Sequence, residues 1–502
     1  MEHIITALCD ILFSPDVLLV LTAGVFLGLV VGVIPGLNDT ITMAVIMPIT
    51  FTMPPQYAFM LLVGVYCSAC YGGSIPAILL KIPGTAASVV TTFDGYPMAQ
   101  KGQAGLAVGL STISSVFGGL FSTFVLMFFA PILASYALRF GPAEYFSLGI
   151  FGLATVAGMS GKNVLKNLIV CFLGLLLATV GMSPQTGYPR FNLECDFLLE
   201  GIPLVSCLIG LFGVSSVFHL MERIARTAAE AKKDMTIPKL GKTLPDWKMT
   251  KRLMPTWLAG STIGTVIGII PGAGMIMAIY LAYDVVKARY KKLVFGSGVP
   301  EGVAAPESAN NAVVAGSMVP LLALGVPGNS TSALFLGALM IQGMRPGPAL
   351  FREHTDMAFL IIVGFFVANI IMGPMGLMLG RVLARLVFRI PHTLMTTAIV
   401  LLCLTGGFAY GNHIFHVWVA LCSGIVGYLM DKTGLPQGPL ILALILGPMI
   451  ETGYEQSLSI SMGSHWIFLQ SPISLVMLIA SGFFCLLPIF SKIKESRALN
   501  SE

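Results

Sequence analysis

Apolar segments long enough to cross a lipid bilayer recur along the whole chain. An α-helix needs roughly 20 apolar residues to span ~30 Å of hydrocarbon. Only 10% of the residues are charged, whereas soluble proteins carry roughly a quarter. The sequence therefore predicts an all-α integral membrane protein, a polytopic helical bundle with roughly 11 crossings. The clearest apolar runs are Val17–Val33, Gly105–Ala130, Val164–Gly181, Met357–Gly380 and Ser471–Phe490.

Glycine and proline are abundant, with 55 and 30 residues, and they lie inside apolar segments rather than in polar linkers. Proline removes a backbone donor and glycine admits positive φ, so a helix breaks where the two adjoin. Interrupted backbone at membrane depth must line protein or a wet cavity. We therefore expect broken helices, with re-entrant Pro-Gly hairpins at residues 35–36 and 271–272, as in the interior of a transporter.

Two glycine-proline signatures occur twice in the same order, which indicates an internal repeat. The segment GVIPGLN at 32–38 is echoed by GIIPGAG at 268–274. A Gly-Ser pair, a proline and a later Pro-Gly occupy 73–84 and again 316–328. The predicted segments are a first transmembrane repeat at 1–221, a cytoplasmic basic linker at 222–252, a second transmembrane repeat at 253–457, and a final helix with a cytoplasmic tail at 458–502.

Positive charge predicts how the chain is oriented. Segment 222–252 carries nine Lys or Arg against four acids, so it is expected in the cytoplasm. The C-terminal tail is also basic and is expected there, whereas the first fifteen residues lack Lys and Arg and are expected in the periplasm. The two halves would then start on opposite sides and form an inverted repeat. Arg345 and Arg352 do not fit this charge map.

Small polar residues follow the helix breaks in both repeats. A fresh helix N-terminus suits a carboxylate, and unwound carbonyl groups suit Na⁺. The Pro-Gly tips at 83–85 and 327–329 are expected to meet near the bilayer midplane. The predicted substrate-binding residues are Ser74, Lys81, Gly84, Thr85, Ser88, Asn310, Asn311, Gly328, Asn329, Ser330 and Thr331. The predicted coupling-ion (Na⁺) residues are Gly36, Asn38, Gly272, Gly274 and Glu307.

Structural interpretations of the same residues stay open. A Pro-Gly pair in a membrane helix can be a simple kink. The polar block at 300–311 can serve helix capping and interhelical hydrogen bonding. Lys81, placed before a break, can attract an anionic substrate, reach the membrane surface, or pair with Asp39.

Several motifs resemble the large membrane (permease) subunit of the tripartite tricarboxylate transporter family, over nearly the whole chain. The resemblance implies uptake of citrate, other tricarboxylates or small carboxylates by symport with Na⁺ or H⁺ across a bacterial inner membrane. It also implies two partners, a small membrane subunit and a periplasmic solute-binding protein. The chain departs from the family where Asn38-Asp39 and Lys81 stand. The motifs are GVIPGL, YGGSIPAILLKIPGTAAS, FDGYPMAQKGQAG, PGAG and PEGVAAPESANNAVVAGSMVPLLALGVPG.

Other functions are weighed against this one. A standalone secondary anion transporter or a channel would show the same hydropathy. An intramembrane enzyme would need a motif such as HExxH, and the chain has neither that nor the GxxxxGK[ST] of an ATPase. We expect no catalytic residues, no cofactor beyond the coupling ion, no other metal and no nucleic-acid partner. A homodimer is left open.

Overall fold

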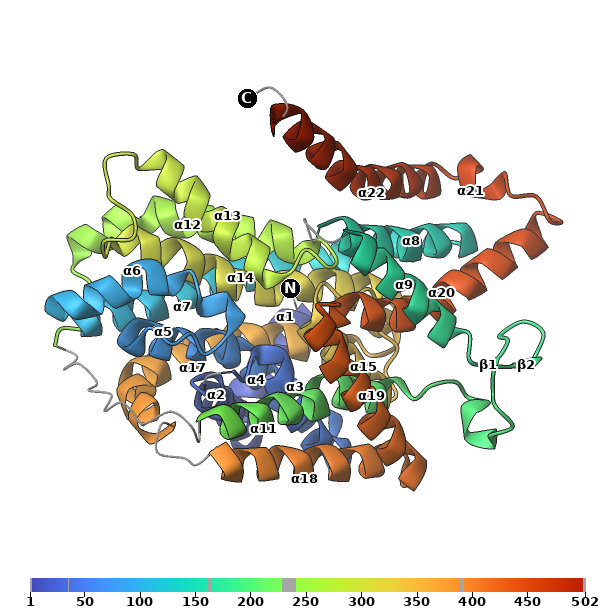
Figure 1. Cartoon of the computed structure of the whole chain (residues 1–502), viewed down its shortest axis with the longest axis horizontal. Helices are drawn as coiled ribbons and strands as arrows, with labels where there is room; N and C mark the ends of the chain where they lie inside the picture. Colours follow the sequence, from blue (N-terminus) through green and yellow to red (C-terminus); the bar gives the residue numbers. More distant parts are fainter. Residues whose placement is uncertain (1, 35, 160–163, 228–240, 388–391, 500–502) are drawn as a thin grey trace.

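The computed structural model describes the chain except residues 1, 35, 160–163, 228–240, 388–391 and 500–502. Nearly all of its regular structure is helical. Two short antiparallel strands, β1 (Gly181–Met182) and β2 (Pro189–Arg190), form a small hairpin at the edge of the molecule (Figure 1). The prediction of an all-α fold is confirmed.

The helices of the first half are mostly short or interrupted. They are α1 (Glu2–Phe13), α2 (Pro15–Gly32), α3 (Asp39–Ile46), η1 (Met47–Thr52), α4 (Pro55–Gly72), α5 (Ser74–Leu80), η2 (Ala86–Ser88), α6 (Thr91–Met98), η3 (Ala99–Gln103), α7 (Ala104–Ala137), α8 (Pro142–Met159), α9 (Val164–Ala178), η5 (Asp196–Leu198), α10 (Leu204–Leu208), η6 (Ile209–Val214) and α11 (Ser215–Thr227).

The helices of the second half include more of the long ones, although α7 of the first half is longer than any of them. They are α12 (Trp247–Ile269), α13 (Met275–Arg289), α14 (Pro300–Leu324), α15 (Ser330–Ile341), α16 (Pro348–Glu353), α17 (Thr355–Val387), α18 (His392–Gly411), α19 (Ile414–Thr433), α20 (Gln437–Ile460), α21 (Ile467–Gln470) and α22 (Pro472–Leu499).

Seven helices in the described part of the chain are long and apolar enough to cross a membrane. Shorter apolar helices accompany them, because Pro and Gly interrupt the chain inside apolar segments. The polytopic membrane fold is thus confirmed, while the number of crossings stays a prediction. The seven candidates are Pro15–Gly32, Pro55–Leu80, Thr91–Ala137, Leu204–Glu222, Thr355–Gly380, Thr393–Gly411 and Ile414–Thr433.

The helices break where the Pro-Gly signatures predict. Helix α2 ends at Gly32 and α12 at Ile269, and each is followed by a glycine with positive φ, Gly36 (96°) and Gly272 (72°). Pro35, the first proline of these pairs, lies outside the described residues. The later breaks separate α5 from η2 and α14 from α15.

Both halves pack a helix pair through glycines spaced four residues apart, which puts them on one helix face. Helix α2 meets α4 at Gly24, Gly28 and Gly32, and α12 meets α14 at the corresponding glycines, 260, 264 and 268. A Cβ on Gly24 would lie 2.4 Å from the Leu61 carbonyl oxygen. The motif pairs thus occupy equivalent packing positions. The segment boundaries and the inversion stay predictions.

The buried hydrophobic side chains form two separate clusters. The larger includes the cores of α2, α4, α7, α14 and α17. The smaller gathers side chains of α8, α9 and α20 around Val326, which precedes the second Pro-Gly tip. Helices α8, α9, α20 and α22 pack mainly against one another, in the upper right of Figure 1. The second Pro-Gly tip therefore lies next to the boundary between the clusters.

Candidate substrate and ion sites

One backbone hydrogen bond joins the two Pro-Gly loops of each half. The Gly36 amide donates to the Gly84 carbonyl over 3.1 Å, and the Gly272 amide donates to the Gly328 carbonyl over 2.8 Å. The positive φ of Gly36 and Gly272 lets these amides turn toward the neighbouring loop. In each half, the two helix breaks are therefore held together by a backbone hydrogen bond.

Gly84 and Gly328 stand at sites of close backbone approach. A Cβ on Gly84 would lie 2.6 Å from the Gly32 carbonyl oxygen, and one on Gly328 would lie 2.7 Å from that of Gly268. Because no side chain fits at these separations, both glycines are needed sterically, whether or not they also contact substrate.

Besides the packing of α7 against α14, the halves meet where the first residues of α3 and α15 come together. The Thr40 and Thr331 hydroxyl oxygens lie 2.8 Å apart, and the Thr331 hydroxyl donates to the Asp39 carboxylate over 2.6 Å. Among the described residues, no hydrogen bond joins Thr85 directly to the tip that contains Asn329. The first-half partner of that tip is instead the start of α3.

Asn329 caps α15. Its Oδ1 atom accepts from the Ser332 amide over 2.8 Å, and Ser332 Oγ in turn accepts from the Asn329 amide over 2.9 Å. The Asn329 side-chain amide donates to the Tyr66 hydroxyl over 2.9 Å. In this conformation the predicted substrate donor thus fixes the shape of the tip.

Thr85 and Ser88 form the equivalent turn in the first half. Ser88 Oγ accepts from the Thr85 amide over 3.3 Å and donates to the Thr85 carbonyl over 2.8 Å. Within the described residues, the Thr85 hydroxyl is buried and has no hydrogen-bond partner. An unpaired buried hydroxyl is unfavourable, so a substrate that accepted its hydrogen bond would be favoured at this tip, and this role stays a prediction.

A polar cavity of about 270 Å³ opens beside the contact between the halves. It brings together two sequence-predicted residues, Asn38 and Ser330, from the starts of α3 and α15. An adjoining cavity of about 330 Å³ reaches Gly36. We call the space they form the polar pocket. The residues lining the first cavity are Asn38, Thr40, Ile41, Leu211, Phe212, Ser215, Ser216, His219, Ser330, Asp431, Gln437 and Gly438.

The far wall of the polar pocket consists of residues that the sequence analysis missed. Asp431 Oδ2 lies 2.9 Å from His219 Nε2 and accepts from the Gln437 amide over 2.9 Å. Gln437 also lies 3.4 Å from the Ser215 hydroxyl. More than two hundred residues separate His219 from Asp431, so only the scarcity of charge in the apolar segments could have drawn attention to them.

Glu307 is fully buried and accepts hydrogen bonds from four hydroxyl groups. Ser74 donates over 2.6 Å, Ser111 and Ser115 each donate over 3.0 Å, and Thr91 is the fourth donor. We call this group the Glu307 cage. Ser74, predicted to bind substrate, here contacts the carboxylate instead. Ser111 and Ser115 lie four apart on α7, a spacing from which one polar face could have been predicted.

Asn310 and Asn311 are buried on α14 and hold it against neighbouring helices. The Asn310 amide donates to the Cys70 carbonyl over 3.1 Å, and the Asn311 amide donates to the Cys67 carbonyl over 3.3 Å. Their side-chain oxygens have no hydrogen-bond partner among the residues that the structure describes. These contacts agree with the interhelical interpretation of this block, and a substrate role stays a prediction.

The glycines predicted to hold Na⁺ are distributed over both halves. Gly36 lines the polar pocket, while Gly272 faces Val156 of α8 and Gly274 begins α13 with φ of 75°. No hydrogen bond joins any of the three to Glu307 within the described residues. A single sodium site built from all of them therefore stays a prediction.

Lys81 lies at the C-terminal end of α5, with a left-handed backbone (φ 59°) and an exposed side chain. Its Nζ atom stands 5.7 Å from the centre of the Tyr96 ring. Pairing of Lys81 with Asp39 is wrong, because Asp39 accepts from Thr331 instead. Lys81 lines a separate surface cavity with Asp284, and its attraction of substrate stays a prediction.

Sequence comparison identifies related proteins. The sequence profile of the tripartite tricarboxylate transporter TctA family matches residues 18–442. An uncharacterized 52.8 kDa protein in the TAR-I ttuC' 3' region of Agrobacterium vitis is 36% identical over 463 residues, 92% of this chain and 91% of its own length. An uncharacterized protein in the TAR-II ttuC' 3' region of the same organism is 34% identical over 236 residues, 47% of this chain and 97% of its own length. No solved structure matches.

Proposed function

Because the chain belongs to the tripartite tricarboxylate transporter TctA family, we propose that it imports small carboxylates, using a Na⁺ or H⁺ gradient. It would act as the large membrane subunit in a bacterial inner membrane. A periplasmic solute-binding protein would deliver the substrate, and a small membrane subunit would complete the assembly. The polar pocket would bind the substrate, and the Glu307 cage would bind the coupling ion.

The polar pocket suits a carboxylate. The N-termini of α3 and α15 meet there, which places the positive ends of two helix dipoles beside the pocket. The Asn38 and Asn329 side chains already cap one backbone amide of each helix. Ser330 and Ser215 add hydroxyl groups. Asp431 is held by His219 and Gln437, so its charge is partly offset.

The Glu307 cage suits a cation. A fully buried carboxylate is unfavourable unless it is paired or neutral. Within the described part of the chain its hydrogen-bond partners are all hydroxyl groups, so a bound Na⁺ or proton would supply the missing positive charge. Hydroxyl and carboxylate oxygens are ligands for hard cations.

One hydrogen-bonded path connects the two sites, and this observation carries the proposal. Ser74, bonded to Glu307, directly follows Gly73, whose carbonyl accepts from the Gly84 amide over 3.0 Å. The Gly84 carbonyl accepts from Gly36, which lines the polar pocket. A cation bound to Glu307 would compete with the Ser74 hydroxyl for the carboxylate and would thus bias the backbone that shapes the substrate pocket.

Uptake by proteoliposomes tests this function. The three components would be reconstituted with labelled citrate outside and with a Na⁺ gradient, a proton gradient or neither. Gradient-dependent accumulation supports the proposal, whereas equilibration without accumulation indicates a channel. Equally fast uptake of micromolar substrate by this subunit alone would identify a standalone transporter.

A further inference from the structure

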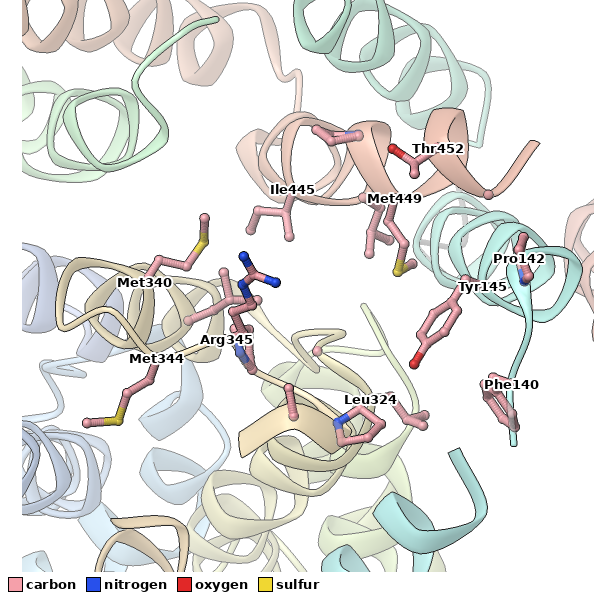
Figure 2. Close-up of a pocket in the computed structure, with 18 of the residues that line it drawn as sticks. Phe140, Pro142, Tyr145, Leu324, Met340, Met344, Arg345, Ile445, Met449 and Thr452 are labelled. Atoms are coloured by element: carbon pink, nitrogen blue, oxygen red, sulfur yellow. The ribbon is translucent and has the colours of Figure 1, made fainter. Parts of the chain in front are cut away.

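A cavity of about 1240 Å³ lies between the two hydrophobic clusters. One wall comes from α8 and α20, including Tyr145, Ile445 and Met449. The opposite wall comes from α15 and the segment that follows it, including Met340 and Arg345 (Figure 2). We call this space the Arg345 cavity. It is separate from the polar pocket and from the Glu307 cage.

Arg345 is the one charged side chain among the residues lining this cavity. Figure 2 shows its guanidinium group extending into the open space toward Ile445. Within the described residues, Arg345 forms no hydrogen bond or ion pair. Arg352, by contrast, pairs with Glu353 over 2.7 Å. The guanidinium donors of Arg345 are therefore free to receive an anion.

The position of Arg345 is fixed by a tight backbone contact. A Cβ on Gly325 would lie 3.3 Å from the Pro346 carbonyl oxygen, and Gly347, with φ of 98°, packs against the same turn. Leu324 and Gly325 line the cavity and lead directly into the second Pro-Gly tip. Arg345 thus rests on the loop that ends at the substrate pocket.

Two helices run from this cavity to the polar pocket. Helix α15 places Ser330 at the polar pocket and Met340 at the cavity. Helix α20 places Gln437 at the polar pocket and Ile445 at the cavity. The seam between α15 and α20, next to the Pro-Gly tip, therefore connects the two spaces.

We propose that the Arg345 cavity is the outer substrate-binding station of the transport path, where Arg345 binds a carboxylate group before the substrate reaches the polar pocket. Guanidinium groups bind carboxylates bidentately. Arg345 is exposed to solvent and is the one cation among the residues that line the cavity, so its attraction for anions should be strongest at low ionic strength. This proposal rests on the proposed function, the transport of carboxylates. It adds Arg345 as a substrate-binding residue and the Arg345 cavity as the place where the substrate binds first.

Uptake by variants is the first test. In the assembled system at low salt, Arg345→Gln is expected to raise KM roughly tenfold, the loss of one charge-assisted interaction. At high salt, the difference in KM between the wild type and Arg345→Gln should become smaller. Arg345→Lys keeps the positive charge and should retain part of the affinity for the carboxylate. Arg352→Gln, which removes the same charge from an arginine outside the cavity, is the matched control. If Arg345→Gln and Arg352→Gln have the same KM, the proposal is wrong. The proposed transport function would still stand, because it is tested by uptake in the wild type.

Cysteine protection gives a second readout that needs no transport. Met449→Cys would be labelled in liposomes with a membrane-impermeant maleimide, and the chain without this substitution corrects for native cysteines. Citrate is expected to slow labelling when Arg345 is present and to have no effect when Met449→Cys is combined with Arg345→Gln. Protection that depends on anionic lipid and not on citrate would assign Arg345 to a lipid headgroup and overturn the proposal.

Discussion

The hydroxyl oxygens of Thr40 and Thr331 lie 2.8 Å apart, although 291 residues separate them in the chain. This contact joins the first Pro-Gly hairpin of one half to the second Pro-Gly tip of the other. It borders the polar pocket, which Thr40 helps to line. Because the first helix break of one repeat thus meets the second helix break of the other, we expect the shape of the shared site to depend on these two side chains.

Removing the Thr331 hydroxyl is expected to weaken transport. Thr331→Val leaves the Asp39 carboxylate without its 2.6 Å donor, so KM for the carboxylate should rise roughly tenfold. Thr331→Ser keeps the hydroxyl and should behave as wild type. Thr397→Val, on an exposed face of α18, controls for the substitution itself. An unchanged KM in Thr331→Val would show that this contact does not shape the site.

Neutralising Glu307 is expected to uncouple transport from the ion gradient. Glu307→Gln keeps the size of the side chain but removes the charge that a cation would balance. Gradient-driven accumulation should fall at least roughly tenfold, while exchange of internal for external substrate persists. Glu353→Gln, on exposed α16, is the matched control. Normal accumulation by Glu307→Gln would exclude Glu307 as the coupling site.

Asn329 can be tested for capping and substrate binding separately. Asn329→Ala removes the α15 cap, which costs about 1 kcal/mol, whereas Asn329→Asp keeps a capping oxygen but adds negative charge beside the pocket. Both should lower uptake, but only Asn329→Ala should lower thermal stability. Asp246→Ala removes the α12 cap and should leave uptake unchanged. Full uptake by Asn329→Asp would leave Asn329 with a capping role alone.

The glycine rows of α2 and α12 are expected to be intolerant of any side chain. A Cβ on Gly28 would lie 2.6 Å from the Val65 carbonyl oxygen, and one on Gly264 would lie 2.3 Å from that of Ala309. Either alanine substitution should cost about 1–3 kcal/mol through overpacking. Thermal melting in detergent would measure this, with Gly482→Ala as control because no atom lies within 4 Å of its Cβ position. Equal melting temperatures would refute the packing argument.

The features predictable from sequence are those that local chemistry determines. Proline removes a backbone donor and glycine admits positive φ, so the interruptions near Gly36, Gly272 and Gly328 were predicted. Glu307 was selected because an acid in an apolar segment is costly. Its four hydroxyl partners come from three other helices, and only tertiary packing could identify them.

Contacts between segments that lie far apart in the chain could not be predicted from the sequence. His219 and Asp431 meet because α11 packs against α19, and neither residue carries a local motif. Asn329 was predicted as a substrate donor by its place after Pro-Gly, but the hydroxyl that holds it belongs to Tyr66, far away in the chain. For Lys81 the sequence left substrate attraction, a place at the membrane surface and pairing with Asp39 open, and the left-handed backbone that ends α5 was not predicted.

We predict that the start of the chain and the basic linker lie on opposite sides of the membrane. The inverted repeat requires this arrangement. Only an odd number of crossings in the first half lets the second half begin on the other side. Glu2→Cys and Lys242→Cys, at two exposed positions, would be treated with a membrane-impermeant maleimide in intact spheroplasts and in inverted vesicles. Because Cys9 and Cys422 are already exposed, the chain without an added cysteine sets the background. Glu2→Cys should gain label in spheroplasts alone and Lys242→Cys in inverted vesicles alone, since the basic segment stays in the cytoplasm. Labelling of both from the same side would require an even number of crossings and would leave the halves parallel.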